Sequence, residues 1–112
     1  RTFYAPGAKR CGTPVVVLQT WALQDSTGTA YPVKGPGWHW HTFADFTTAL
    51  VRGAQRYYEV LAAAGVAATV APAGQAFQRV HADDRHLFNK LYARDGKHQS
   101  RVGAFLVAQT LF

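Results

Sequence analysis

The sequence predicts an α/β fold, in the form of a partial three-layer α/β/α sandwich with parallel strands. Two short apolar runs, residues 14–18 and 66–71, have the length and the β-branched content of buried strands. Between them lies one long segment, residues 42–64, with the periodicity of an amphipathic helix. A strand, a helix and a strand of these lengths form a βαβ unit, which normally makes a right-handed crossover between parallel strands. We expect the 112 residues to form a single domain around this unit, with a modest core that a partner or a missing segment would complete.

Composition limits the classes of function. The net charge is +6 and the pI is near 9.9, but the twelve Lys and Arg residues are scattered singly, with Lys9-Arg10 as the densest pair. Nucleic-acid-binding proteins usually concentrate charge on one face or arm, so we expect no nucleic-acid partner. No apolar run approaches the ~20 residues that span a bilayer, so no membrane span is expected. The chain begins at Arg1, has no Met and looks like a processed product or a piece of a longer protein.

The cysteine content does not determine the redox compartment of the protein. Cys11 is the single cysteine and cannot form a disulfide within this chain. It is either a free thiol or pairs with another chain, and a secreted location is compatible with both.

The N-terminal part leads into the first strand. Residues 1–13, which include Pro6 and two glycines, are expected to form a loop. Gln19, Thr20 and Trp21 follow the strand at once, and open α/β proteins place ligand contacts just past the ends of buried strands. These three are candidate substrate-binding residues. The alternative is that Trp21 caps the core and Gln19 satisfies nearby backbone.

Residues 24–40 are rich in Gly, Pro and aromatic residues and are expected to form a long loop. His39 and His41 alternate within its end, but two histidines without a third ligand nearby are weak evidence for a metal. We expect no metal and no cofactor, and interpret the aromatic residues as packing over a pocket or against a partner.

The segment 42–64 is the clearest helix. Thr42 can cap its start, Asp45 lies favourably in the first turn, and Gly65 can adopt the left-handed backbone that ends a helix. Its apolar residues recur at three- and four-residue steps, which indicates core packing: Phe43, Phe46, Leu50, Ala54, Tyr57, Leu61 and Ala64.

The remaining elements are shorter. The parallel crossover predicts that Gln19 and residues 72–74 emerge at the same edge of the sheet. Residues 75–81 are expected to form a short helix, residues 83–86 a solvated charged turn, and residues 102–112 a last helix with Ser100 as its N-cap.

An acid lies three residues before a histidine in the turn that contains Asp95, Gly96 and His98. With a parallel sheet this turn would return to the edge where Gln19 and Gly74 lie. Asp95 could then bind the Nδ1–H of His98 and fix its tautomer, leaving Nε2 as a general base. Asp95 and His98 are therefore the candidate catalytic residues, although an Asp-x-x-His turn alone is a weak signal.

From about residue 14 to its end, the chain resembles the C-terminal half of the SGNH (GDSL-like) hydrolase superfamily, whose fold is flavodoxin-like. Four segments carry the resemblance, and the last, continued by Ser100, Gly103 and Ala104-Phe105-Leu106, is the strongest. They are Val15-Val16-Val17-Leu18-Gln19-Thr20-Trp21-Ala22, Leu61-Ala62-Ala63-Ala64-Gly65, Val70-Ala71-Pro72-Ala73-Gly74-Gln75-Ala76-Phe77 and Leu91-Tyr92-Ala93-Arg94-Asp95-Gly96-Lys97-His98.

The resemblance implies that Asp95 and His98 complete a Ser-His-Asp triad in an ester hydrolase, acting on acyl or acetyl groups of carbohydrates. Two departures stand out. Gln99 replaces the proline that usually follows the histidine, and the serine, glycine and asparagine blocks that precede this region in the family are not in the sequence. Ser26 and Ser100 do not lie in a strand-to-helix elbow. The nucleophile is therefore expected on a missing N-terminal half or another chain.

The alternative is a non-catalytic, hydrolase-like module. Such a module would serve as a binding or structural subunit of a larger assembly, with its exposed sheet edge and aromatic loop as the interface.

Overall fold

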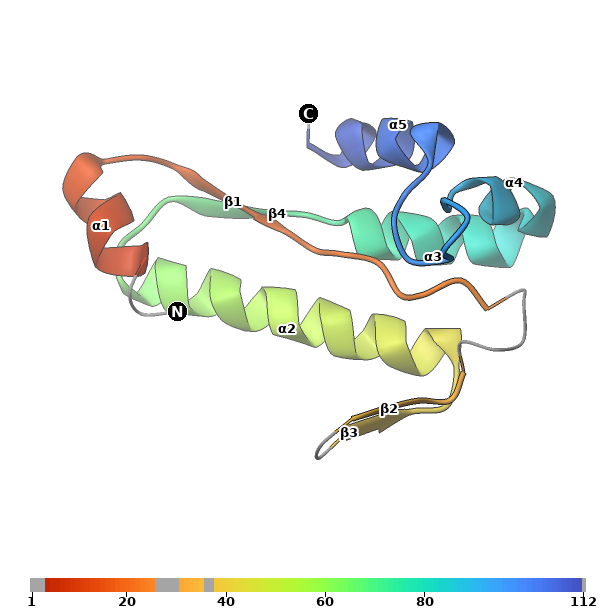
Figure 1. Cartoon of the computed structure of the whole chain (residues 1–112). Coiled ribbons are helices and arrows are strands. Elements are labelled where there is room, and N and C mark those ends of the chain that lie inside the picture. Colours follow the sequence, from red (N-terminus) through yellow and green to blue (C-terminus); the bar gives the residue numbers. More distant parts are fainter. Residues whose placement is uncertain (1–3, 26–30, 36–37, 112) are drawn as a thin grey trace.

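The computed structural model describes residues 4–25, 31–35 and 38–111, and the fold is mixed α/β with a small parallel sheet (Figure 1). The elements, in chain order, are α1 (Tyr4–Cys11), β1 (Val15–Leu18), β2 (Val33–Gly35), β3 (Trp38–Trp40), α2 (Phe43–Ala63), β4 (Ala68–Ala71), α3 (Ala73–Asp83), α4 (Arg85–Lys90) and α5 (Arg101–Thr110).

The predicted βαβ unit is confirmed. Strands β1 and β4 pair in parallel, with Val15 opposite Ala68 and Leu18 opposite Ala71. The long helix α2 connects the two strands in the sequence, and in the structure it runs along them (Figure 1). Val15 and Val17 pack with residues of α2 and of the following turn, whereas Val16 and Leu18 are 53% and 42% exposed. One face of the sheet is therefore covered, and the other presents apolar side chains.

Both ends of α2 have the caps that the sequence predicts. The Thr42 hydroxyl accepts a hydrogen bond from the Asp45 amide at 3.1 Å. Gly65 follows the helix with φ +79°, a conformation that other residues rarely adopt. Capping chemistry is local, which is why the sequence alone places these ends within one residue.

Two predicted loops contain regular structure instead. Residues 4–11 form α1, because Pro6 lies in the first turn, where its missing N–H is not needed, and the segment supplies alanine and long-chain helix formers. Gly12, with φ +64°, ends this helix.

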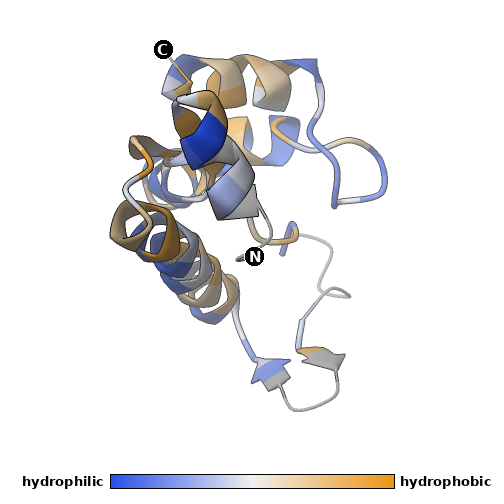
Figure 2. Cartoon of the chain, turned by 90° about the vertical axis from the view of Figure 1, so that its left-hand side faces the viewer, coloured by the Kyte–Doolittle hydropathy of each residue, from blue (hydrophilic) through white to orange (hydrophobic). Residues whose placement is uncertain are grey.

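In the segment predicted as a long loop, β2 and β3 form an antiparallel hairpin, because β-branched and aromatic residues favour strands. The hairpin projects from the body of the molecule, as Figure 1 and Figure 2 show.

The charged segment 83–86, predicted as a solvated turn, contains the start of helix α4. Asp84 is the N-cap of α4, and its carboxylate accepts a hydrogen bond from the Leu87 amide at 3.0 Å. An aspartate three residues before an apolar position is a helix-start signal, and it outweighs the interpretation as a solvated turn.

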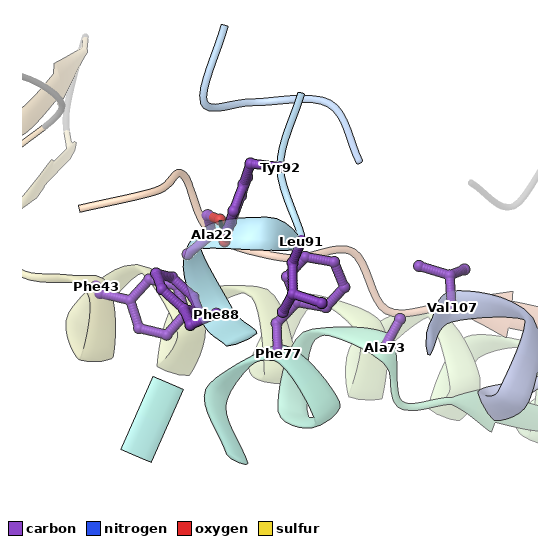
Figure 3. Packing of buried hydrophobic residues seen from close by; sticks show 8 residues of the cluster. All are labelled: Ala22, Phe43, Ala73, Phe77, Phe88, Leu91, Tyr92 and Val107. Atoms are coloured by element: carbon purple, nitrogen blue, oxygen red, sulfur yellow. Dashed lines mark hydrogen bonds between the residues drawn. The ribbon is translucent and has the colours of Figure 1, made fainter. Parts of the chain in front are cut away.

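The main core gathers side chains from the segment after β1, from the four helices α2 to α5 and from the loop after α4 (Figure 3). Its buried members are Ala22, Phe43, Ala73, Phe77, Phe88, Leu91, Tyr92 and Val107. The rings of Phe77 and Phe88 lie edge-on to Tyr92, with centroids 5.5 and 5.2 Å away. The Tyr92 hydroxyl donates to the Ala22 carbonyl at 2.6 Å, and burial raises the pKa of this phenol, so it stays protonated. This core fixes both the segment after β1 and the start of the loop after α4.

The close approach of α5 to that loop depends on a glycine. A Cβ built on Gly103 would overlap the carbonyl oxygen of Leu91. Just before it, Ser100 caps α5 by accepting from the Gly103 amide at 3.2 Å, and its hydroxyl donates to the Lys90 carbonyl at 2.5 Å. The predicted N-cap is confirmed, and it joins α5 to the end of α4.

We therefore expect Gly103→Ala to lower the free energy of unfolding by about 1–3 kcal/mol, the usual cost of overpacking. Gly53→Ala is the matched control. Gly53 is also in a helix, and a Cβ there meets nothing within 4 Å. It should raise stability by about 0.5–1 kcal/mol, since alanine favours helices. Urea unfolding followed by circular dichroism measures both. Equal effects of the two substitutions would contradict the close contact of α5.

The described part of the chain is more extended than a compact domain of the same length. Its Cα radius of gyration is 15.4 Å, against about 13 Å expected for a compact chain of this length. Phe105 of α5 is 67% exposed, in addition to the apolar residues on the open sheet face. None of the helices described is both long and apolar enough to cross a bilayer.

Candidate active site

The two strand ends meet at one edge of the sheet, as the crossover predicts. The Gln19 amide donates to the Ala71 carbonyl at 3.0 Å, and the Gly74 amide donates to the Gln19 carbonyl at 3.1 Å. A Cβ on Gly74 would overlap the Thr20 carbonyl oxygen, so the start of α3 lies directly against the segment that follows β1.

The Gln19 side chain is buried and makes hydrogen bonds within the fold. Its side chain is 2% exposed, and its Oε1 accepts from the Gln75 amide at 2.7 Å. The N-cap of α3 is Pro72, which makes no side-chain cap bond, so Gln19 takes over that role from outside the helix. Its Nε2 donates to the Gln75 side chain at 3.3 Å. Of the two interpretations from sequence, the geometry supports the one in which the Gln19 side chain accepts a hydrogen bond from a nearby backbone N–H.

Thr20 and Trp21 differ in their surroundings. Thr20 is exposed. Trp21 stacks on the buried ring of Phe77, with centroids 5.0 Å apart and planes at 13°. Its indole Nε1–H donates to the carbonyl of Lys97 at 2.9 Å. The Gln24 amide donates to the Gly96 carbonyl at 2.9 Å, so the segment after β1 runs beside the loop of Asp95 and His98.

That loop is closed by its own backbone. Tyr92 and Gln99 form an isolated antiparallel bridge, and the Ala93 amide donates to the His98 carbonyl at 2.7 Å. The turn between them needs Gly96, whose φ is +70°. The short closed loop therefore holds positions 95 and 98 next to each other.

The side chains of Asp95 and His98 form the hydrogen-bonded pair that the sequence predicts. The distance from Asp95 Oδ2 to His98 Nδ1 is 2.5 Å. Asp95 Oδ1 accepts from the backbone amides of Lys97 and His98 at 2.9 and 3.0 Å. The hydrogen bond from the His98 side chain, followed by those two amides, holds the pKa of Asp95 well below its usual range. The carboxylate thus stays ionised, and it favours the tautomer with the proton on Nδ1.

The His98 ring has one nitrogen left for chemistry. Its side chain is 79% exposed, and that of Asp95 is 44% exposed. With Nδ1–H bound to the carboxylate, the lone pair of the neutral imidazole is on Nε2. The pair can therefore accept a proton at Nε2 and stabilise the imidazolium that results.

The depressed pKa gives a titration prediction. In wild-type protein the Asp95 carboxyl should titrate below its ordinary value of about 3.9, and His98→Ala should move the midpoint up toward that value. Since folding lowers this pKa, the stabilisation from the ionised carboxylate is complete above about pH 4 and is lost as the pH falls toward the folded-state pKa. Carboxyl ¹³C NMR measures the midpoint. An unshifted wild-type midpoint would contradict the pairing.

A second Asp–His pair was missed from the sequence. Asp25 Oδ2 lies 2.8 Å from His81 Nε2, and Asp25 Oδ1 accepts from Arg85 at 2.8 Å. The His81 ring stacks on Phe43 at 4.2 Å and meets Phe88 edge-on at 4.7 Å. Asp25 and His81 are 56 residues apart, so no spacing signal links them. Both Asp25 oxygens and the Nε2 atom of His81 take part in these contacts. The cluster therefore joins α3 and α4 to the segment after β1.

Metal ligands and a serine nucleophile are not found among the residues described. No group of three or more His, Cys, Asp or Glu side chains there could hold a metal ion. The rings of His39 and His41 are 3.9 Å apart, and Cys11 is an exposed free thiol. Ser100 caps α5, and Ser26 lies outside the described residues.

Comparisons with known proteins do not assign the chain to a family. No protein-family model matches the chain, and searches of curated proteins and of solved structures found no match.

Proposed function

We propose that the chain is the C-terminal part of an SGNH-type ester hydrolase, and that Asp95 and His98 are two members of its Ser-His-Asp triad. The serine would lie on an N-terminal segment outside these 112 residues or on another chain. The observation that carries the proposal is the 2.5 Å hydrogen bond from His98 Nδ1 to an ionised Asp95, with Nε2 free on an exposed ring. This is the arrangement by which a histidine activates a hydroxyl nucleophile.

The chemistry follows from the pair. His98 Nε2 takes the serine proton while the serine oxygen attacks the ester carbonyl, and the Asp95 carboxylate stabilises the imidazolium. The imidazolium then returns the proton to the leaving alcohol, which departs as the acyl-enzyme forms. In deacylation, His98 takes a proton from water as the water oxygen attacks the acyl carbonyl. The bond from the carbonyl carbon to the serine oxygen then breaks, the serine oxygen takes the proton from His98, and the carboxylic acid leaves. Acyl or acetyl esters of carbohydrates are the proposed substrates.

The open sheet supports the need for further structure. The Val15 and Gln19 amides both donate toward β4, so the N–H and C=O groups of Val16 and Leu18 point to the opposite edge of β1. Each strand of the parallel sheet has one neighbour among the described residues. A groove of about 160 Å³ lies along the β1–α2 junction. Its lining comes from the end of β1 and the middle of α2: Val17, Leu18, Gln19, Thr20, Ala49, Leu50, Gly53, Ala54 and Tyr57.

An added strand beside β1 would satisfy these backbone groups and fill this groove. With it, the βαβ unit would extend toward the three-layer α/β/α sandwich that the resemblance implies.

A second candidate function is a non-catalytic binding or structural module. The same open edge and the exposed Val16, Leu18 and Phe105 favour it, since an unpaired strand and apolar side chains form an interface whether or not chemistry follows.

Ester hydrolysis distinguishes the two candidates. The 112 residues alone should not hydrolyse p-nitrophenyl acetate or acetylated oligosaccharides, because they lack the activated serine. The protein that contains them together with the serine-bearing part should hydrolyse at least one of these esters. If that whole protein is folded and hydrolyses neither ester, the hydrolase proposal fails and the structural module remains.

A further inference from the structure

We propose that Trp21 is a positioning residue for the Asp95–His98 pair. This inference rests on the proposed function for its purpose, but its geometry and its test do not. The indole Nε1–H donates to the carbonyl oxygen of Lys97 at 2.9 Å. That carbonyl belongs to the peptide unit whose N–H, on His98, donates to Asp95 Oδ1 at 3.0 Å.

The contacts form one continuous chain of hydrogen bonds. It runs from the indole through the Lys97–His98 peptide to one oxygen of Asp95, and from the other oxygen to His98 Nδ1. A peptide group that accepts at its oxygen becomes a better donor at its N–H, because hydrogen bonds in a chain polarise one another. The indole therefore strengthens the bond that orients the carboxylate, although it touches neither catalytic side chain.

The support behind Trp21 is rigid. Its ring stacks at 13° on Phe77, which is fully buried, and Ala22 next to it is also fully buried. The exposed catalytic loop is tied to this support at Lys97 by the indole and at Gly96 by the Gln24 amide. Among the residues described, the indole bond is the hydrogen bond that ties this peptide to a segment outside the loop, and it is lost when the N–H is removed.

This assigns Trp21 a role different from substrate binding. The indole nitrogen, the polar atom that a substrate would use, is already committed to the loop. The aromatic face provides the anchorage, and the N–H provides the coupling to the pair. Removing the N–H while keeping the ring separates these two contributions.

Trp21→Phe removes the N–H and keeps a smaller aromatic ring that can still stack on Phe77, and long-range ¹H–¹⁵N NMR of the His98 ring measures the result. In wild-type protein we expect the Nδ1–H tautomer and slow exchange of this proton with water. In Trp21→Phe the exchange should be about fivefold faster, the factor expected for one net hydrogen bond. The Asp95 carboxyl midpoint should also rise toward its ordinary value. Trp40→Phe is the control, since Trp40 lies on β3 and stacks on Phe46 at 4.2 Å.

Unchanged exchange of the Nδ1 proton and an unchanged Asp95 midpoint in folded Trp21→Phe would overturn the proposal, and Trp21 would then be a core residue only. If Trp21→Phe does not fold, benzothienylalanine at position 21 keeps the bicyclic shape and lacks the N–H, and the same two outcomes decide. The readout needs neither serine nor substrate. A coupled pair in a protein that hydrolyses no ester would leave the positioning role standing and remove the proposed function.

Discussion

Replacing His98 by alanine is expected to reduce kcat for ester hydrolysis by about 10⁴-fold or more in the protein that carries both His98 and the serine. Without Nε2, nothing takes the serine proton during attack or returns it to the leaving alcohol. The fold should be retained, because the His98 side chain is 79% exposed. The measurement is the initial rate of p-nitrophenyl acetate hydrolysis at saturating substrate.

The control for His98→Ala is His86→Ala. His86 is an exposed histidine on α4, outside the Asp95–His98 loop. It should keep the wild-type rate. A His98→Ala rate within tenfold of wild type would show that another group activates the nucleophile.

The second large effect is expected from Asp95→Asn, which should lower kcat by about 10⁴-fold. Asp95 Oδ1 accepts from two backbone amides, so the asparagine oxygen can keep that position and preserve the turn. Its NH₂ group would then face His98 Nδ1, which can only accept from it. The proton would move to Nε2, and the imidazole could no longer serve as a base toward the serine.

Asp83→Asn is the matched control for that change. Asp83 pairs with Arg79 at 2.6 Å on the surface of α3, and both side chains are largely exposed. An exposed pair of this kind contributes little to stability, so the rate should stay at the wild-type level. If Asp95→Asn and Asp83→Asn hydrolyse the ester equally fast, Asp95 has no part in orienting His98.

Local signals in the sequence are enough to predict much of this structure. The caps of α2, the parallel βαβ unit and the meeting of Gln19 with Gly74 all follow from periodicity, capping and the crossover rule. The Asp95–His98 contact is also local, since three residues and one glycine turn bring the pair together.

The features that the sequence does not predict depend on contacts between distant segments. The Asp25–His81–Arg85 cluster joins residues up to 60 positions apart. The cap that Gln19 gives to α3 and the bond from Trp21 to Lys97 become visible only when burial and distance are known. The hairpin β2–β3 was hidden because Gly and Pro surround two very short strands.

Covalent labelling is the most direct test of the proposal that Asp95 and His98 activate a serine outside these 112 residues. The protein carrying that serine is treated with a fluorophosphonate, and the modified residue is identified by peptide mass spectrometry. The account predicts one phosphonylated serine outside the chain described here, modified at least about 10³-fold more slowly in His98→Ala. No labelled serine, or equal labelling rates in wild type and His98→Ala, would contradict it.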